Sequence, residues 1–200
     1  MLPLAGVTSR ASRLSSGVVG CIPQSRVLHS VEDTLALGAR CADLALAGDT
    51  ILLNGDYGAG KSCFARGFLQ RWFGDPNEVV ASPSYLIDIV YPDDGRAQCP
   101  GVAVHHMDLW RLPEGKVDTL VDLPSVFSDC VSLIEWPDRL GTRSMPREYL
   151  SVHLAISNSA LDLEELEDSQ PRFVTLEPTG DRWLERVDAL LEDLPPTGSK

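Results

Sequence analysis

Apolar residues recur at helical spacing in three segments of the chain. They return every three or four positions, which places them along one face of a helix. In the second segment that face consists of Phe64, Phe68 and Trp72, and Gly74 followed closely by Pro76 ends the pattern, as helix-breaking residues do. The predicted helices span residues 31–46, 63–73 and 181–194.

Short apolar or β-branched runs predict strands at residues 51–54, 85–91, 102–109, 131–134, 149–156 and 172–176. Residues 92–101 form a polar loop, and residues 113–128 show no clear period, which indicates a short helix with loops. The last two strands are expected to form a hairpin. Because strands alternate with helices early and follow one another later, we predict an α/β fold: a mixed sheet with a parallel core and antiparallel edge strands, flanked by helices.

Composition and charge exclude several classes of protein. A chain of 200 residues with 44% apolar residues suits one folded domain plus a tail, and no apolar run reaches the ~18 residues that span a membrane. The net charge of −12 argues against direct, non-specific binding to nucleic acid, which requires a basic surface. Five scattered cysteines without a C-x-x-C pair argue against disulfides and structural zinc, and favour a reducing compartment.

The first 30 residues differ in composition from the rest. They contain Arg10, Arg13, Arg26 and six serines, but no Asp or Glu. This composition is typical of an organelle transit peptide, mitochondrial rather than plastid in our interpretation. The alternative is a disordered leader on a cytoplasmic protein. Either interpretation places the folded domain at residues 31–194 and a disordered tail at residues 195–200.

Residues 55–62 match the phosphate-binding pattern G-x-x-x-x-G-K-[ST] at every fixed position. The loop stands between the strand predicted at residues 51–54 and the helix predicted at residues 63–73, which is the context in which this pattern binds nucleotides. Its glycines allow backbone N–H groups to turn toward phosphates, and the helix N-terminus adds partial positive charge. Lys61 would then reach the terminal phosphates and Ser62 would hold Mg²⁺. The alternative is an ordinary glycine-rich turn.

Two acidic positions are candidates for the metal and the reaction. Glu135 ends the strand predicted at residues 131–134, where the carboxyl ends of strands meet a nucleotide, although an ordinary acid at a strand end explains it too. Asp108 and His106 share one face of a strand. Asp108 could orient the attacking water or the outer shell of the metal. We interpret His106 as a structural histidine rather than a catalytic one, and the role of Arg111 stays open.

Residues 82–85, Ser-Pro-Ser-Tyr, lie in a turn between the second helix and the following strand. Hydroxyl groups in a turn near the γ-phosphate are suited to nucleotide sensing. An ordinary turn with proline in its second position explains the same residues equally well.

Together these motifs resemble the TsaE family, the small ATPases of tRNA threonylcarbamoyladenosine synthesis. The resemblance covers about residues 30–172, and the motif Arg66-Gly67-Phe68 adds to it. It rests on four blocks in the right order: Gly55-Asp56-Tyr57-Gly58-Ala59-Gly60-Lys61-Ser62, Ser82-Pro83-Ser84-Tyr85, His106-Met107-Asp108-Leu109-Trp110-Arg111-Leu112 and Leu133-Ile134-Glu135-Trp136-Pro137. Three departures are Ser84 where the family usually has Thr, Trp110 where Tyr is usual, and a long loop at residues 92–101.

The resemblance implies a P-loop NTPase-like fold and a complete site for ATP and Mg²⁺. It implies that Ser62 and Glu135 bind Mg²⁺ and that the catalytic set is Lys61, Asp108 and Glu135. Ser84 would belong to a nucleotide-sensing loop. The implied nucleotide contacts are Gly55, Gly58, Ala59, Gly60, Lys61, Ser62 and Cys63 at the phosphates, Ser84 and Trp136 nearby, and, on a looser motif, Val31 and Thr34 at the adenine.

The resemblance also implies partners. In the family, the ATPase docks on a TsaB–TsaD assembly that modifies adenosine 37 of tRNA, so this chain would contact tRNA only through its partner. In an organelle the partner could be a TsaD-like protein alone. We expect slow ATP hydrolysis that the partner raises. The alternatives are a small-molecule kinase, although no arginine-rich lid is visible, and a nucleotide-gated binding module without significant turnover.

Overall fold

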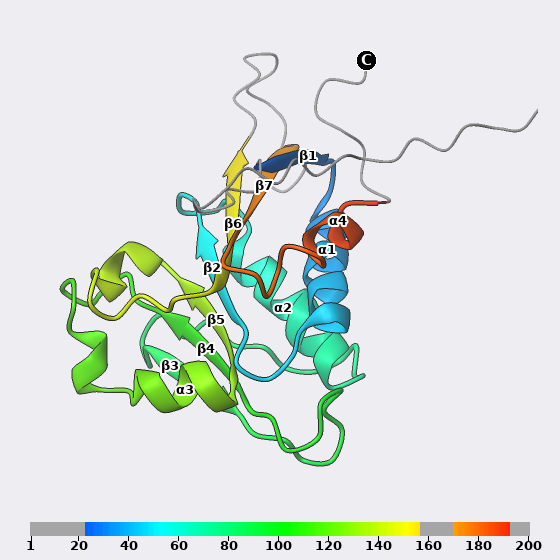
Figure 1. Ribbon diagram of the computed structural model, residues 1–200. Coiled ribbons are helices and arrows are strands. Elements are labelled where there is room, and N and C mark those ends of the chain that lie inside the picture. The colour runs from blue at the N-terminus through cyan, green and yellow to red at the C-terminus, as the bar shows by residue number, and fades with distance from the viewer. Residues whose placement is uncertain (1–22, 157–169, 193–200) are drawn as a thin grey trace, which may run out of the picture.

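The computed structural model describes residues 23–156 and 170–192 of the chain (Figure 1). The predicted leader up to residue 22, residues 157–169 between the last two strands, and the predicted tail at residues 195–200 lie outside these residues. No helix among the described residues is long and apolar enough to cross a membrane.

One seven-stranded sheet organises the described part of the chain (Figure 1). Its order is β1-β7-β6-β2-β5-β4-β3. The four central strands, β6, β2, β5 and β4, are parallel, whereas β7, β1 and β3 pair in antiparallel fashion at the edges. The strands are β1 (Gln24–Leu28), β2 (Thr50–Asn54), β3 (Asp88–Tyr91), β4 (Val104–Asp108), β5 (Val131–Glu135), β6 (Tyr149–Ile156) and β7 (Arg172–Thr179). The predicted mixed sheet, with its parallel core and antiparallel edges, is confirmed.

Helices cover both faces of the sheet. The larger core lies between the sheet and α1, α2 and α4, and a smaller core lies under α3 and two 3₁₀ turns (Figure 1). Alternation along β2 divides these cores, since Ile51 and Leu53 face the larger one and Leu52 faces the smaller one. The helices are α1 (Val31–Leu44), α2 (Lys61–Trp72), α3 (Leu123–Asp129) and α4 (Val187–Leu190), with 3₁₀ turns η1 (Val117–Thr119) and η2 (Pro137–Leu140).

Two glycines let α1 and α2 approach each other closely. A Cβ atom added to Gly67 would stand 2.1 Å from the Leu35 carbonyl oxygen, and one added to Gly38 would stand 2.1 Å from the Phe64 carbonyl oxygen. Real side chains do not tolerate such distances, so only glycine permits this crossing. At the start of α1, Ser30 and Asp33 form a reciprocal capping box. The crossing fixes the position of α2, whose first turn completes the phosphate-binding loop.

The structure changes the start of the folded domain. The composition of residues 1–30 predicts a leader, whereas Gln24–Leu28 form strand β1, which pairs along its whole length with β7. The Ser25 and Thr175 hydroxyls also lie 2.8 Å apart across this pair. An antiparallel edge strand can be polar on its exposed side, so composition alone does not separate it from a leader. The fold therefore includes residues from Gln24, not from residue 31.

Several predicted elements are shorter than expected, and the structure gives a physical reason for two of them. Residues 181–194 do not form one helix: turns precede α4, which covers only Val187–Leu190. The buried indole of Trp183 and the Arg186 guanidinium, which binds the buried Asp49 carboxylate, hold this segment against the core. Strand β3 begins at Asp88 instead of residue 85, because Ile87 adopts a left-handed backbone conformation with φ 69°.

Candidate functional site

The predicted phosphate-binding loop leaves the carboxyl end of β2 and enters α2. Gly55 adopts φ 143°, and a Cβ atom there would lie 2.3 Å from the Leu154 carbonyl oxygen, so the loop passes against β6 where only glycine fits. Gly60 precedes α2 with φ 107°, a conformation that favours glycine. The two glycines shape the loop so that its backbone closes around the start of the helix.

Lys61 is held inside this loop. Its Nζ donates to the carbonyl oxygens of Gly55 and Asp56, both at 2.7 Å, and lies 3.9 Å from the centre of the Trp136 ring. Burial lowers the pKa of Lys61, although nearby carboxylates oppose this change. The ammonium group is therefore held by two carbonyl oxygens and by a cation–π contact with an aromatic ring. It lies next to the space that the loop encloses.

Ser62 and Glu135 meet at the bottom of the site. The Ser62 hydroxyl donates to Glu135 Oε1 at 2.9 Å, and His106 Nε2 lies 3.0 Å from the same oxygen. Glu135 ends β5 and Ser62 lies in the first turn of α2, and both elements are adjacent to β2. The fold thus brings together the two residues that were predicted to bind Mg²⁺, with His106 behind them.

Asp108 connects the end of β4 to the predicted sensing loop. It lies opposite Glu135 in the parallel register of β4 and β5. Its Oδ2 accepts a hydrogen bond from the Ser84 hydroxyl at 2.8 Å, and its Oδ1 accepts one from the Trp110 backbone N–H at 3.0 Å. The Ser82 hydroxyl lies 2.7 Å from that of Ser84. The turn is therefore anchored to the carboxylate.

These groups line one cleft of about 500 Å³, a size that suits a nucleotide. Of the predicted nucleotide contacts, only Gly55 and the buried Ala59 do not line it. Gly55 contributes instead through its carbonyl oxygen, which accepts from Lys61. The predicted residues that line the cleft are Val31, Thr34, Gly58, Gly60, Lys61, Ser62, Cys63, Ser84, Asp108, Glu135 and Trp136.

Four further residues line the cleft: Tyr57 and Ser82, which lie in predicted motifs but were not among the predicted contacts, and Arg66 and Arg172, for which no role was predicted. Arg66 follows Ser62 and Cys63 at helical spacing, so the helical period alone could have indicated it. Arg172 begins β7, is only 5% exposed and donates to the Gln170 carbonyl oxygen. Only the pairing of distant strands brings Arg172 here. Both guanidinium groups add positive charge at the cleft.

Aromatic side chains stand beside the cleft. The Trp110 and Trp136 rings lie 4.4 Å apart at 45°, and the guanidinium of Arg139 lies 5.9 Å from the Trp110 ring. Trp136 adopts a left-handed backbone conformation with φ 59°, which directs the chain into η2. Arg111, whose role the sequence leaves open, lies 4.6 Å from the Tyr85 ring and is not among the residues that line the cleft.

Among the described residues there is no cluster of three or more His, Cys, Asp or Glu side chains that could form a metal cage. Cys41, Cys99 and Cys130 are free thiols. Cys63 lines the cleft, and its Sγ lies 3.7 Å from the Val31 carbonyl oxygen. A metal in this cleft would therefore depend on Ser62, Glu135 and oxygen atoms of a bound nucleotide.

Comparison with known proteins identifies relatives over most of the folded domain. Residues 28–163 match the family "Threonylcarbamoyl adenosine biosynthesis protein TsaE". The chain is 33% identical over 135 residues to "tRNA threonylcarbamoyladenosine biosynthesis protein TsaE" of Mycobacterium tuberculosis, covering 64% of this chain and 76% of the relative. The protein of the same name from Streptomyces coelicolor is 33% identical over 150 residues, 74% of this chain and 91% of the relative.

A solved structure shares the fold. The crystal structure of Bacillus subtilis YdiB superposes with a TM-score of 0.64 and covers 88% of this chain and 97% of its own. The two sequences are 24% identical, so this likeness supports the fold alone.

Proposed function

Because the chain belongs to the TsaE family, we propose that it acts in tRNA threonylcarbamoyladenosine synthesis as an accessory protein that binds ATP with Mg²⁺ and hydrolyses the ATP slowly. The observation that carries this proposal is the 2.9 Å hydrogen bond from the Ser62 hydroxyl to Glu135 at the bottom of the cleft. In P-loop proteins two side chains hold the metal: the Ser or Thr directly after the loop lysine, and an acidic residue at the end of a neighbouring strand.

The donor atoms around this pair suit Mg²⁺. Magnesium prefers oxygen ligands and keeps several of its water molecules, so one hydroxyl and one carboxylate beside phosphate oxygens are sufficient. Ser62 and Glu135 supply these two groups, and no hydrogen bond from the described residues reaches Oε2 of Glu135. When bound there, Mg²⁺ would offset the negative charge on the terminal phosphates.

The loop and Lys61 would bind the phosphates. Backbone N–H groups of residues 58–63 stand at the N-terminus of the twelve-residue α2, where the helix dipole favours anions. Two of the three N–H donors of the Lys61 ammonium contact the carbonyl oxygens of Gly55 and Asp56. The third donor would be available to a phosphate oxygen, a charged acceptor that binds the ammonium more strongly than a neutral carbonyl does.

The proposal gives Asp108 and Ser84 roles at the γ-phosphate. We assign to Asp108 the orientation of the attacking water, because its Oδ1 accepts from the Trp110 backbone N–H and its Oδ2, within the described part of the chain, accepts only from Ser84. The Ser84 hydroxyl can turn from Asp108 toward a γ-phosphate. Water then bonds to the γ-phosphorus as the bond to the bridging oxygen breaks, and ADP and phosphate form.

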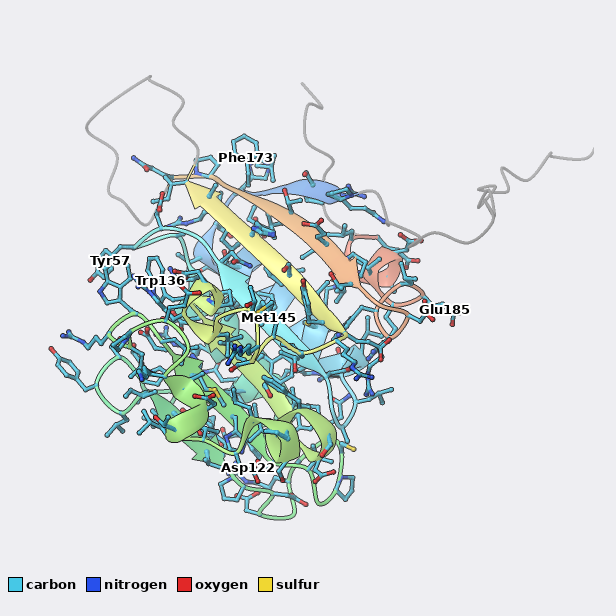
Figure 2. All side chains as sticks on the ribbon, turned by 60° about the vertical axis from the view of Figure 1, so that its left-hand side comes forward. Tyr57, Asp122, Trp136, Met145, Phe173 and Glu185 are labelled. Atoms are coloured by element: carbon cyan, nitrogen blue, oxygen red, sulfur yellow. The ribbon has the colours of Figure 1, made fainter. Side chains whose placement is uncertain are left out.

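Exposed apolar side chains next to the cleft favour a protein partner. Tyr57, Tyr85, Leu86 and Trp110 are 93%, 84%, 70% and 53% exposed. Tyr57 lines the cleft, Trp110 contacts the cleft residue Trp136, and Tyr85 and Leu86 directly follow the cleft residue Ser84 in the chain. Figure 2 shows Tyr57 beside Trp136 at this edge of the molecule. Gathered apolar surface of this kind marks interaction sites, whereas the net charge of −12 disfavours direct contact with tRNA. We propose a TsaD-like partner, with or without a TsaB-like protein, that carries the tRNA.

A pull-down from the source organism tests the partner. Tagged wild-type protein and the Glu135→Ala variant are incubated with lysate in ATP plus Mg²⁺, or in EDTA. The proposal requires a TsaD-like protein with the wild type in ATP plus Mg²⁺ only. If the TsaD-like protein were captured equally under all conditions, its binding would not depend on the nucleotide, and this part of the proposal would be contradicted. A nucleotide-gated binding module that does not hydrolyse ATP would give the same pull-down result. Measuring phosphate release from ATP distinguishes such a module from the proposed ATPase.

A further inference from the structure

His106 makes a contact that the functions proposed above do not use. It lies in β4 with its side chain fully buried, and its Nε2 is 3.0 Å from Glu135 Oε1. The parallel register places Asp108, two residues further along the same face of β4, directly opposite Glu135. His106 thus approaches the carboxylate from below, on the side away from the open cleft, and it does not line the cleft itself.

The chemistry of the pair fixes the direction of this hydrogen bond. An ionised carboxylate only accepts, so His106 Nε2 carries the proton and donates it. The other ring nitrogen, Nδ1, is buried and has no hydrogen-bond partner among the described residues. With its proton on Nε2, the ring presents only a lone pair at Nδ1, so this tautomer leaves no donor unsatisfied there.

Two donors converge on one oxygen of Glu135. Ser62 Oγ and His106 Nε2 both reach Oε1, at 2.9 and 3.0 Å, and no hydrogen bond from the described residues reaches Oε2. Ser62 is itself a proposed metal ligand, so its hydroxyl oxygen has to serve the metal as well. His106 is the donor that serves Glu135 alone. A free Glu135 side chain would have several rotamers. The hydrogen bond from His106 favours the one rotamer that turns Oε2 toward the cleft.

We propose that His106 is a positioning residue for the metal-binding carboxylate: its hydrogen bond to Oε1 presents Oε2 of Glu135 to Mg²⁺. The proposal rests on the magnesium–nucleotide function proposed above. Partners that orient a metal ligand through hydrogen bonds typically change metal affinity by about 10- to 100-fold when they are removed. A histidine that only fills space would change stability and leave metal affinity unaltered.

The test compares His106→Leu, which fills the space without a donor, with His106→Gln, whose amide N–H can replace Nε2–H. His105→Leu is the matched control. His105 neighbours His106 but points to the opposite face, where its Nδ1 lies 2.8 Å from Asp88 Oδ2. Mn²⁺ binding to each protein saturated with ADP is measured by electron paramagnetic resonance, ADP binding is measured in EDTA, and thermal unfolding shows that each variant is folded.

We expect His106→Leu to weaken Mn²⁺ binding at least tenfold, with ADP binding in EDTA changed by less than about twofold. His106→Gln and His105→Leu should stay close to wild type in Mn²⁺ affinity. Wild-type affinity in folded His106→Leu, or equal loss in Leu and Gln variants that are both folded, would overturn the proposal. If the wild type itself binds no metal with ADP, the proposed function fails, which is a distinguishable result.

A second measurement needs no variant. Nitrogen chemical shifts of the His106 ring in the wild-type protein, recorded without metal or nucleotide, report which ring nitrogen carries the proton. The proposal requires a protonated Nε2 that is hydrogen-bonded to Glu135. A neutral ring with its proton on Nδ1 would overturn it, even if His106→Leu proves unable to fold.

Discussion

The ammonium group of Lys61 lies 3.9 Å from the centre of the Trp136 ring, although the two residues belong to different strand–loop units of the sheet. Lys61 opens α2, and Trp136 follows the last residue of β5. Because β5 is the direct neighbour of β2, the parallel register brings the loop lysine and this tryptophan together. The indole is therefore placed to respond when the lysine moves.

Nucleotide binding should change the fluorescence of Trp136. A phosphate that draws Lys61 away from the ring alters the electrostatic environment of the indole. We expect ATP or ADP with Mg²⁺ to change the emission of the wild type, and Trp136→Phe to lose most of that change. Trp183→Phe serves as the control, since Trp183 is buried in the other part of the core near α4. An unchanged signal in Trp136→Phe would contradict the assignment.

Replacing Ser84 tests the predicted sensing loop. The Ser84 hydroxyl donates to Asp108 Oδ2 at 2.8 Å, and removing one hydrogen-bond donor at a reacting phosphate typically costs about 10²- to 10³-fold in rate. We expect Ser84→Ala to lower ATP hydrolysis by at least tenfold, and Ser84→Thr to retain it because the hydroxyl survives. Steady-state phosphate release measures both variants, and similar rates in Ala and Thr variants would exclude a role for the hydroxyl.

A stability prediction concerns the crossing of α1 and α2. In Gly67→Ala the new Cβ would stand 2.1 Å from the Leu35 carbonyl oxygen, which forces the helices apart. Overpacking of this kind destabilises by about 1–3 kcal/mol or more. The matched control is Arg71→Ala on the same helix, which removes an exposed ion pair with Asp43 and should cost about 1 kcal/mol or less. Urea unfolding measures both, and equal losses would contradict the packing argument.

The organelle leader remains a prediction with a sharper boundary. Since strand β1 begins at Gln24, the segment to test is residues 1–22 and not residues 1–30. We expect residues 1–22 fused to a fluorescent protein to direct it to an organelle, mitochondria rather than plastids. A fusion that replaces Arg10 and Arg13 with Gln should fail to do so. Diffuse cytosolic fluorescence from the unaltered fusion would remove the organelle proposal.

The sequence predicted the parts of the fold that local patterns determine. The phosphate-binding loop, the strand before it and the helix after it follow from glycine positions and apolar periods that a single segment contains. The helical period of residues 181–194 predicted one helix, yet the buried Trp183 and the contact of Arg186 with Asp49 hold the first residues of this segment in turns, and the helix begins only at Val187. Tertiary contacts outweighed local propensity there.

Site residues could be predicted only where they belong to a recognisable sequence motif. Ser62, Asp108 and Glu135 were found in this way, and the structure brings them to one cleft. Arg172 was not found, because it reaches the cleft only through the pairing of β7 with β6 and β1. The contact of His106 with Glu135 depends on the register of β4 against β5, which no pattern within either strand specifies.

The most direct test of the proposed function measures phosphate release from ATP by the wild type, Lys61→Ala and Glu135→Ala, each with Mg²⁺ and with or without a TsaD-like partner. Lys61 contacts the loop and Glu135 binds Ser62, so each variant removes one half of the phosphate–metal site. We predict slow release by the wild type alone, faster release with the partner, and a loss of about 100-fold or more in both variants. Equal rates in all three proteins would contradict the proposal.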